Sequence, residues 1–300
     1  MRVAVAGSSG LLGSALVGHL TRRGHVVRRF VRRPAQAPDE ISWDTEGRLD
    51  PDDLRGLDAV VNLGGAGLGD RRWTTSYRST ILRSRTAPTG ALARALADAD
   101  DGPRVLLQAS AVGYYGDRGD EELTEASEPG EGFLADVVRA WEAATEPAED
   151  AGVRVAHLRS GIVMSRRGGS FGRLLPLLRL GVGGPLGDGR NVWPWITLLD
   201  HARAIEHLLT ADVSGPVNLT APQPAPQREI IGEIARTLRR PALVRVPRFA
   251  LRLVLGEFAD DVLSSQRALP RVLTESGFKH VHPDLPHAAA WVTGRPARPR

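Results

Sequence analysis

Residues 2–13 read RVAVAGSSGLLG, a short apolar run that leads directly into closely spaced glycines. The apolar run is typical of a buried β-strand, and Leu12, Leu16 and Leu20 follow it at the spacing of one helix face. A strand, a glycine-rich turn and a helix in this order predict the first unit of a parallel α/β sheet that binds a nucleotide.

The turn itself has the pattern G-x-x-G-x-x-G. Its three glycines allow a tight turn, a close backbone approach to a pyrophosphate, and close packing of the helix on the strand. The phosphates are then expected on the free N–H groups at the positive end of the helix. The predicted pyrophosphate site comprises Gly7, Ser8, Ser9, Gly10, Leu11, Leu12 and Gly13. The alternative is a turn that is only rich in glycine.

Beyond residue 13, apolar runs alternate with helical patterns. Strands are expected at residues 25–31, 41–43, 58–63, 104–110 and 153–159, and helices at about 74–99, 131–151, 200–210 and 228–239. This alternation predicts a Rossmann-type doubly wound parallel sheet with a smaller α/β C-terminal lobe. The expected units are a nucleotide domain (1–160), a substrate lobe partly returning to the sheet (161–245), a small helical domain (246–293) and a disordered tail (294–300).

Composition excludes several classes of function. The chain has no cysteine, which excludes disulfides, thiolate nucleophiles and iron–sulfur clusters and fits a cytoplasmic location. Its net charge is +4, but of the 39 basic residues only Lys279 is lysine, and the arginines are scattered. Without a basic stripe interleaved with aromatic residues, no nucleic-acid partner is expected. No apolar run is long enough to span a membrane.

The end of the second strand bears on which dinucleotide binds. An acidic residue there favours NAD, whereas arginine suits the 2′-phosphate of NADP. The chain reads FVRRP at this point, so Arg32 and Arg33 predict NADP(H) in preference to NAD(H). The alternative is that both are solvated arginines in an arginine-rich chain.

Ligands bind at the carboxyl ends of parallel strands, and two further segments end strands here. One contains Asn62, Leu63, Gly64 and Gly65, and the other runs from Ser110 to Asp117. Ser110 is expected at both cofactor and substrate, where Tyr114 or Tyr115 would donate a proton. The alternative for this second segment is a turn with two packed aromatic rings.

Taken together, these segments resemble the extended short-chain dehydrogenases/reductases. The chain is most similar to the atypical epimerase-family subgroup, whose members end in a small domain of unknown function. The resemblance extends over residues 1 to about 292. It rests on GSSGLLG (7–13), NLGG (62–65), RRW (71–73), SR (84–85), SAVGYYGD (110–117), WE (141–142), LRSGIVM (158–164), GVGGPLGDGR (181–190), WI (195–196), GPVNLTAP (215–222) and QRALP (266–270).

The resemblance also shows what this chain lacks. Typical members carry a Tyr-x-x-x-Lys pair on the helix expected at 131–151, where this chain has Phe133 and Val137, or Leu134 and Val138. A second departure is WITLLD at 195–200, where relatives read like WIHIDD, so Thr197 and Leu199 replace a histidine and an acid. Extended members often pair through the helices expected at 74–99 and 131–151, so the resemblance also implies a homodimer.

The predicted function is therefore that of an NADP(H)-binding oxidoreductase or epimerase acting on a small carbonyl or hydroxyl compound, with a sugar or its nucleotide as the candidate class. Tyr114, assisted by Ser110, is the first choice to replace the missing dyad. Arg85 is expected near the cofactor or an anionic substrate group, with Trp73, Trp193 and Trp195 in a pocket or as packing. The alternative function is a non-catalytic NADP(H)-binding sensor or scaffold.

Two other motifs are rejected as sites. Residues 168–172 (GGSFG) match G-x-S-x-G, but they are expected in a loop well past the nearest strand, without the sharp elbow that a nucleophilic serine needs. Prolines lie between His282 and His287, and these residues together with His280 lack an ordered ligand set, so no metal is expected.

Overall fold

The structure is a computed structural model, and it describes residues 1–44 and 49–296. A parallel sheet of seven strands forms its centre, in the order β11-β7-β5-β4-β1-β2-β3. The strands are β1 (Arg2–Ala6), β2 (Val26–Val31), β3 (Glu40–Ser42), β4 (Ala59–Asn62), β5 (Val105–Ala111), β7 (Arg154–Ser160) and β11 (Gly215–Leu219). The predicted Rossmann-type parallel sheet is confirmed.

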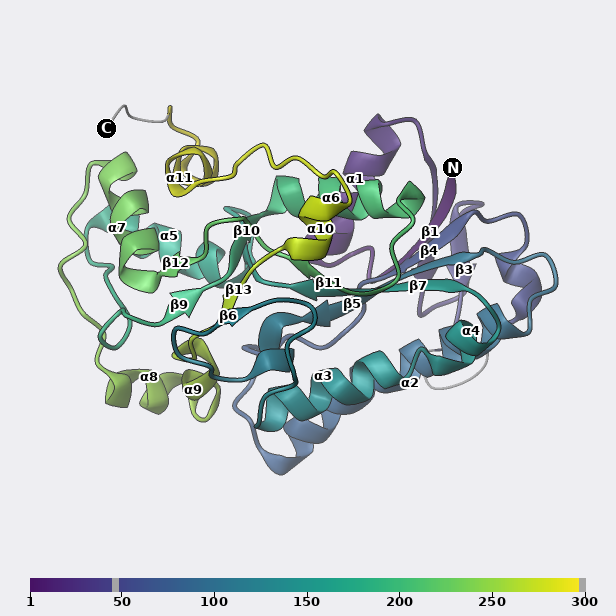
Figure 1. The fold of residues 1–300 in the computed structure, drawn as a ribbon, viewed down its shortest axis with the longest axis horizontal. Coiled ribbons are helices and arrows are strands. Elements are labelled where there is room, and N and C mark those ends of the chain that lie inside the picture. Colours follow the sequence, from purple (N-terminus) through teal and green to yellow (C-terminus); the bar gives the residue numbers. More distant parts are fainter. Residues whose placement is uncertain (45–48, 297–300) are drawn as a thin grey trace.

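Helices cover both faces of this sheet (Figure 1). One face carries α1 (Leu11–Arg22), α6 (Leu198–Thr210) and α10 (Arg271–Glu275), and the other carries α2 (Thr75–Ala97), α3 (Phe133–Ala143) and α4 (Glu146–Asp150). Successive side chains of a strand point to opposite faces. Val3 and Val5 accordingly join the core under α1 and α6, whereas Ala4 and Ala6 join the core under α2.

The second lobe is built from short strands and helices around a core of its own. Met164, Phe171, Trp193 and Trp195 belong to this core, so the tryptophans pack inside the lobe. The elements are β8 (Ile162–Met164), α5 (Gly169–Leu180), β9 (Val192–Trp193), β10 (Trp195–Thr197), β12 (Ala225–Pro226), α7 (Gln227–Leu238), α8 (Arg248–Leu255), α9 (Phe258–Val262) and α11 (Leu285–Thr293).

The end of the chain returns to the first lobe. β13 (Arg267–Ala268) pairs in parallel with β6 (Glu122–Leu123), and two short 3-10 helices, η1 (Pro51–Leu54) and η2 (Val112–Tyr115), complete the elements. The expected disordered tail lies partly outside the described residues, which end at 296.

Two expectations about helices were wrong. The single helix expected at 131–151 is two helices, α3 and α4, with Pro147 in the first turn of the second. Proline supplies no N–H and opposes a helical conformation in the residue before it, so a helix restarts there rather than continuing. Residues 168–172 are not a loop: Gly168 is the N-cap of α5, four residues after β8 ends, and Ser170 lies exposed in the first helical turn.

Candidate active site

The glycine-rich turn connects β1 to α1 and lies against the end of β4. Gly7 has φ +71°, and a Cβ atom there would lie 2.8 Å from the carbonyl carbon and oxygen of Leu63. A Cβ on Gly13 would lie 2.1 Å from the Gly7 oxygen. Larger residues cannot occupy either position without moving the backbone. The turn therefore has no side chain at positions 7 and 13, and Ser9 and Gly10 are exposed on its surface.

The start of α1 is available to an anion. Gly10 is its N-cap, no side chain caps the first N–H groups, and no acidic residue lies in the first turn. These N–H groups and the helix dipole favour a negatively charged ligand. The exposed turn and the uncapped helix together fit the pyrophosphate of a dinucleotide.

Asn62, at the end of β4, shapes the neighbouring turn from inside. Its Nδ2 donates hydrogen bonds to Gln108 Oε1 at 2.9 Å and Thr89 Oγ1 at 3.2 Å, and its Oδ1 accepts one from the Gly64 N–H at 3.2 Å. The side chain is buried, so it holds the turn in place and does not face a ligand. Leu63 is positioned by its own N–H, which donates to the Ala6 oxygen.

Arg85 lies directly against this turn. Its guanidinium donates to the carbonyls of Ala66 and Ile81, both at 3.1 Å, and packs 5.1 Å from the ring centre of Trp141. A Cβ on Gly65 would lie 3.3 Å from its Cζ. Burial lowers the pKa of Arg85 to about 10. Within the described residues, no carboxylate pairs with it, so a half-buried cation faces the site without a counter-ion.

The two arginines after β2 differ in their surroundings. Arg33 makes a two-pronged ion pair with Glu40, with both N···O distances at 2.8 Å. The Arg33 guanidinium and the Gln36 N–H bring the pKa of Glu40 to about 2. Arg32 instead lines a cavity of about 410 Å³, and no carboxylate in the described part of the chain pairs with it. The other lining residues come from α2: Ser76, Ser79, Thr80, Arg83, Ser84 and Pro88.

Ser110, at the end of β5, points into a buried ionic network. Its Oγ donates a hydrogen bond to Glu142 Oε1 at 2.5 Å. The Glu142 carboxylate also accepts hydrogen bonds from Arg159 Nε and Nη2, both at 2.9 Å. Burial disfavours the charge on Glu142, but the hydrogen bonds and charge of Arg159 outweigh this and lower its pKa. Ser110 therefore does not present its hydroxyl to open space.

The two tyrosines of η2 have different environments. Tyr115 is fully buried, and its hydroxyl donates to Asn218 Oδ1 at 2.8 Å and accepts from Arg159 Nη1 at 3.2 Å. Burial raises the pKa of Tyr115. The ring of Tyr114 is half-buried, and the Arg159 guanidinium lies 3.5 Å from its centre. Of the two hydroxyls, that of Tyr114 is therefore better placed to meet a ligand.

The structure shows which side chains occupy the helix position of the missing Tyr-x-x-x-Lys pair. A Cβ on Gly113 would lie 3.5 Å from the Leu134 Cβ and 4.0 Å from Val138 Cγ2, so this pair faces η2. Phe133 and Val137 pack with Trp73 in a cluster that Leu134 also contacts. The position facing the 110–117 loop thus holds two aliphatic side chains.

The WITLLD segment is structural. Thr197 Oγ1 accepts a hydrogen bond from the Asp200 N–H and so caps α6. Asp200 is fully buried and accepts the N–H groups of Val281 and His282, each at 2.8 Å. Burial opposes its charge, but the side chain of His282 and these two backbone N–H groups together lower the pKa of Asp200 to about 2. In the described residues, no three suitable side chains gather to hold a metal, and no helix is long and apolar enough to cross a bilayer.

Comparison with known proteins decides the family. The model of the NAD dependent epimerase/dehydratase family matches residues 3–220, and that of a domain of unknown function, DUF1731, matches residues 246–292. The chain belongs to the NAD-dependent epimerase/dehydratase family. The resemblance inferred from the motifs is thereby confirmed.

Relatives in this epimerase family match along nearly the whole chain. An epimerase family protein of Mycobacterium bovis, Mb2239, is 42% identical over 297 residues, covering 98% of both chains. The solved structure of human epimerase family protein SDR39U1 with NADPH is 34% identical with a TM-score of 0.91, covering 98% of this chain and 99% of that one. A nucleoside-diphosphate sugar epimerase from Corynebacterium glutamicum is 37% identical with a TM-score of 0.80, covering 98% of this chain and 58% of that one.

Sequence reasoning missed three residues at this site. Glu142 and Arg159 lie within the quoted WE and LRSGIVM segments, but their pairing across α3 and β7 was not anticipated. Arg83, which shares a cavity with Arg32, lies on a helix far along the chain. Only the motif resemblance could have indicated the first two, and nothing in the sequence indicated the third.

Proposed function

We propose that the chain is an NADP(H)-dependent oxidoreductase or epimerase acting on a small carbonyl or hydroxyl substrate. The main support for this proposal is the glycine-rich turn, in which Gly7 packs closely against Leu63 and Gly13 against Gly7. This surface, which we call the cradle, lies at the uncapped start of α1. NADP(H) supplies or accepts a hydride when it is bound. The NADPH in the related human structure supports this cofactor, and the sugar-nucleotide epimerase supports sugar nucleotides as the substrate class to screen first.

Arg32 is our candidate for the residue that favours NADP(H) over NAD(H). It lines a cavity together with Arg83 and several hydroxyl groups of α2, which suits a phosphate monoester. Arg33 contributes less in this proposal because Glu40 already neutralises it. Arg85 is proposed to meet a further anionic group of the cofactor or substrate, which would balance its unpaired charge.

Tyr114 is our candidate for the proton donor. Arg159, paired with Glu142, lies over its ring and fixes its position. In this proposal Ser110 acts through Glu142 as a positioning residue, and Tyr115 supports η2 from the core. The proton would pass between the Tyr114 hydroxyl and the substrate oxygen as hydride moves at the adjacent carbon.

A second function has one specific observation in its favour. Leu134 and Val138 occupy the helix positions facing η2, so the usual acid and its lysine are replaced by groups that cannot exchange a proton. The alternative is therefore a protein that binds NADP(H) as a sensor or scaffold without turnover.

Tyr114→Phe distinguishes these two functions. The chain is screened with NADPH or NADP⁺ against carbonyl compounds, alcohols and sugar nucleotides, following nicotinamide absorbance and, for epimerisation, product stereochemistry. With a substrate found, we expect the variant to lose turnover by about 10²- to 10⁴-fold while its NADPH affinity holds.

Tyr115→Phe is the matched control for this test. It removes a buried hydroxyl that bonds to Asn218 and Arg159 but leaves the Arg159–Glu142 pair in place, so it should lower stability by about 1 kcal/mol and leave turnover largely intact. Undiminished turnover in Tyr114→Phe would remove Tyr114 from the mechanism. NADPH binding without any turnover would favour the sensor.

A further inference from the structure

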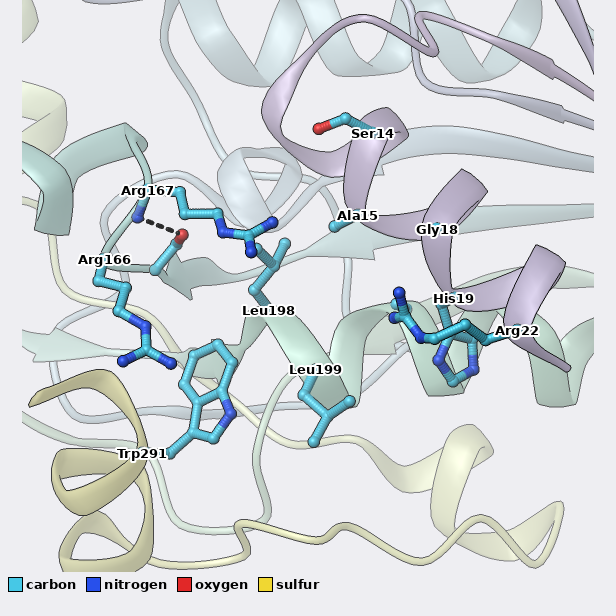
Figure 2. Close-up of a pocket in the computed structure, with 12 residues that line it drawn as sticks. Ser14, Ala15, Gly18, His19, Arg22, Arg166, Arg167, Leu198, Leu199 and Trp291 are labelled. Carbon is cyan, nitrogen blue, oxygen red and sulfur yellow. Dashed lines mark hydrogen bonds between the residues drawn. The ribbon is translucent and has the colours of Figure 1, made fainter. Parts of the chain in front are cut away.

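A second cavity lies between α1 and α6, beside the connection from β8 to α5 (Figure 2). Its volume is about 240 Å³. Its lining residues are Ser14, Ala15, Gly18, His19, Arg22, Ser165, Arg166, Arg167, Leu198, Leu199, Ala202 and Trp291. On α1 they belong to the second turn and beyond, so the helix N-terminus that suits a pyrophosphate is not part of this cavity.

Arginines from two elements converge on this cavity. Arg22 comes from the end of α1, and Arg166 and Arg167 come from the connection between β8 and α5. The buried Ser165 Oγ accepts the Arg167 N–H at 3.0 Å and so fixes this connection. Figure 2 shows the Arg22 and Arg167 side chains reaching from opposite sides into the space above Leu198 and Leu199.

The charge of these arginines is not balanced by the protein. No Asp or Glu is among the described residues that line the cavity, and none forms an ion pair with Arg22, Arg166 or Arg167. His19 also lines it, but its Nε2 lies 2.7 Å from Glu206 and is already paired. Three guanidinium groups around one small space repel one another, and an anion between them relieves that repulsion.

The shape of the cavity restricts the anion. Guanidinium groups bind phosphate through paired hydrogen bonds, and the half-buried indole of Trp291 supplies a flat apolar wall beside Arg166 (Figure 2). The volume lies below the usual range of about 300–1,000 Å³ for drug-sized ligands, so the part of the ligand that the cavity encloses is small. We propose that this cavity binds a phosphate monoester whose other end is a small planar group, separately from the dinucleotide.

Phenyl phosphate is the probe for this site, measured by equilibrium dialysis with the full chain. We expect one equivalent to bind, more tightly than inorganic phosphate, and with an affinity that falls as salt is added. Because no residue of the glycine-rich turn (7–13) lines the cavity, excess NADPH should not displace the probe. Phenol, which lacks the charge, should not bind.

The double variant Arg22→Gln/Arg167→Gln should weaken phenyl phosphate binding by about ten-fold or more, since each lost charged hydrogen bond has at least that effect. Leu199→Asp, which places a carboxylate in the cavity, should weaken it too. The control is Arg104→Gln/Arg179→Gln, which removes the same charge from exposed positions outside the cavity and should leave binding unchanged.

A loss of phenyl phosphate binding can be distinguished from a loss of folding. All four arginines are exposed, so the variants should melt like the parent chain, and melting curves check this. Wild-type affinity in Arg22→Gln/Arg167→Gln, equal losses in both double variants, or displacement of the probe by NADPH would each overturn the proposal. The result does not depend on whether the chain turns over a substrate, so failure here leaves the proposed function intact.

Discussion

Arg159 is the residue around which the candidate site is assembled. Its guanidinium pairs with Glu142, donates to the Tyr115 hydroxyl and lies over the Tyr114 ring, and its side chain is only 4% exposed. Burial opposes its charge, but the hydrogen bonds and charge of Glu142 outweigh this and raise the pKa of Arg159. The group therefore stays charged, and its partners must hold it in place.

Glu142→Gln tests this dependence. The change keeps the shape but leaves a buried guanidinium without its carboxylate, so we expect the free energy of unfolding to fall by about 3–5 kcal/mol, measured by denaturant titration. Asp136→Asn is the control, because it breaks an exposed pair with Arg139 and should cost under about 1 kcal/mol. An equal fall in the free energy of unfolding for both variants would mean that the buried pair contributes no more to stability than the exposed one.

A buried histidine provides a pH-dependent prediction. His201 is fully buried with Nε2 2.9 Å from Ser160 Oγ, and burial lowers its pKa from 6.5 to about 4. The unfolded chain therefore binds more protons between these values, and stability falls as the pH drops from 6.5 to 4, by up to about 3 kcal/mol. His201→Gln should flatten this part of the stability curve, and an unchanged slope would contradict the assignment.

Single residues also show how far the sequence could be interpreted. The glycines at 7 and 13 were predictable because their spacing follows from the strand–turn–helix geometry itself. The difference between Arg32 and Arg33 was not predictable. In the sheet, β3 pairs with β2 in a register that places Glu40 opposite Arg29, and this brings Glu40 within reach of Arg33. The register of the two strands is visible only in the folded sheet.

At the scale of elements, six strands of the central sheet were predicted to within one residue, whereas the seventh, β11, was not placed. A strand buried on both faces has a short, mainly apolar run, which marks β1, β4 and β5 in the sequence. The buried strand β7 also contains His157 and Arg159. Helix ends depend on local backbone details, and so the break between α3 and α4 near Pro147 was missed. α5 was missed because the glycines at its start are typical of a loop.

The start of α6 joins two distant parts of the chain. Asp200 holds the backbone at 281–282, just before α11, and Asp200→Asn would replace one accepting oxygen with a donor. We expect a loss of roughly 3 kcal/mol of stability, together with faster amide hydrogen exchange across 281–293 than in the parent chain. Unchanged exchange there would show that other contacts hold this segment.

At the scale of the whole molecule, the C-terminal segment is part of one structure with the nucleotide-binding lobe. β13 pairs with β6, and Asn218 Nδ2, on the edge strand β11, donates to the Leu269 oxygen at 2.9 Å. Contacts between residues so far apart in the sequence cannot be derived from local sequence patterns. The proposed domain boundaries and a homodimer through the segments 74–99 and 131–151 stay predictions, and light scattering in solution would measure the oligomeric state.

In the proposed function, the cradle at the start of α1 binds NADP(H), and Arg32 sets the preference for NADP(H) over NAD(H). This proposal is tested by fluorescence titration of NADPH and NADH, side by side, with the parent chain, Arg32→Gln and Arg33→Gln. A charged hydrogen bond contributes about 1.5–3 kcal/mol, so NADPH should bind at least about ten-fold more tightly than NADH. Arg32→Gln should remove most of this preference, and Arg33→Gln should keep it. Equal affinities of the parent chain for both nucleotides, or no binding of either, would contradict the account.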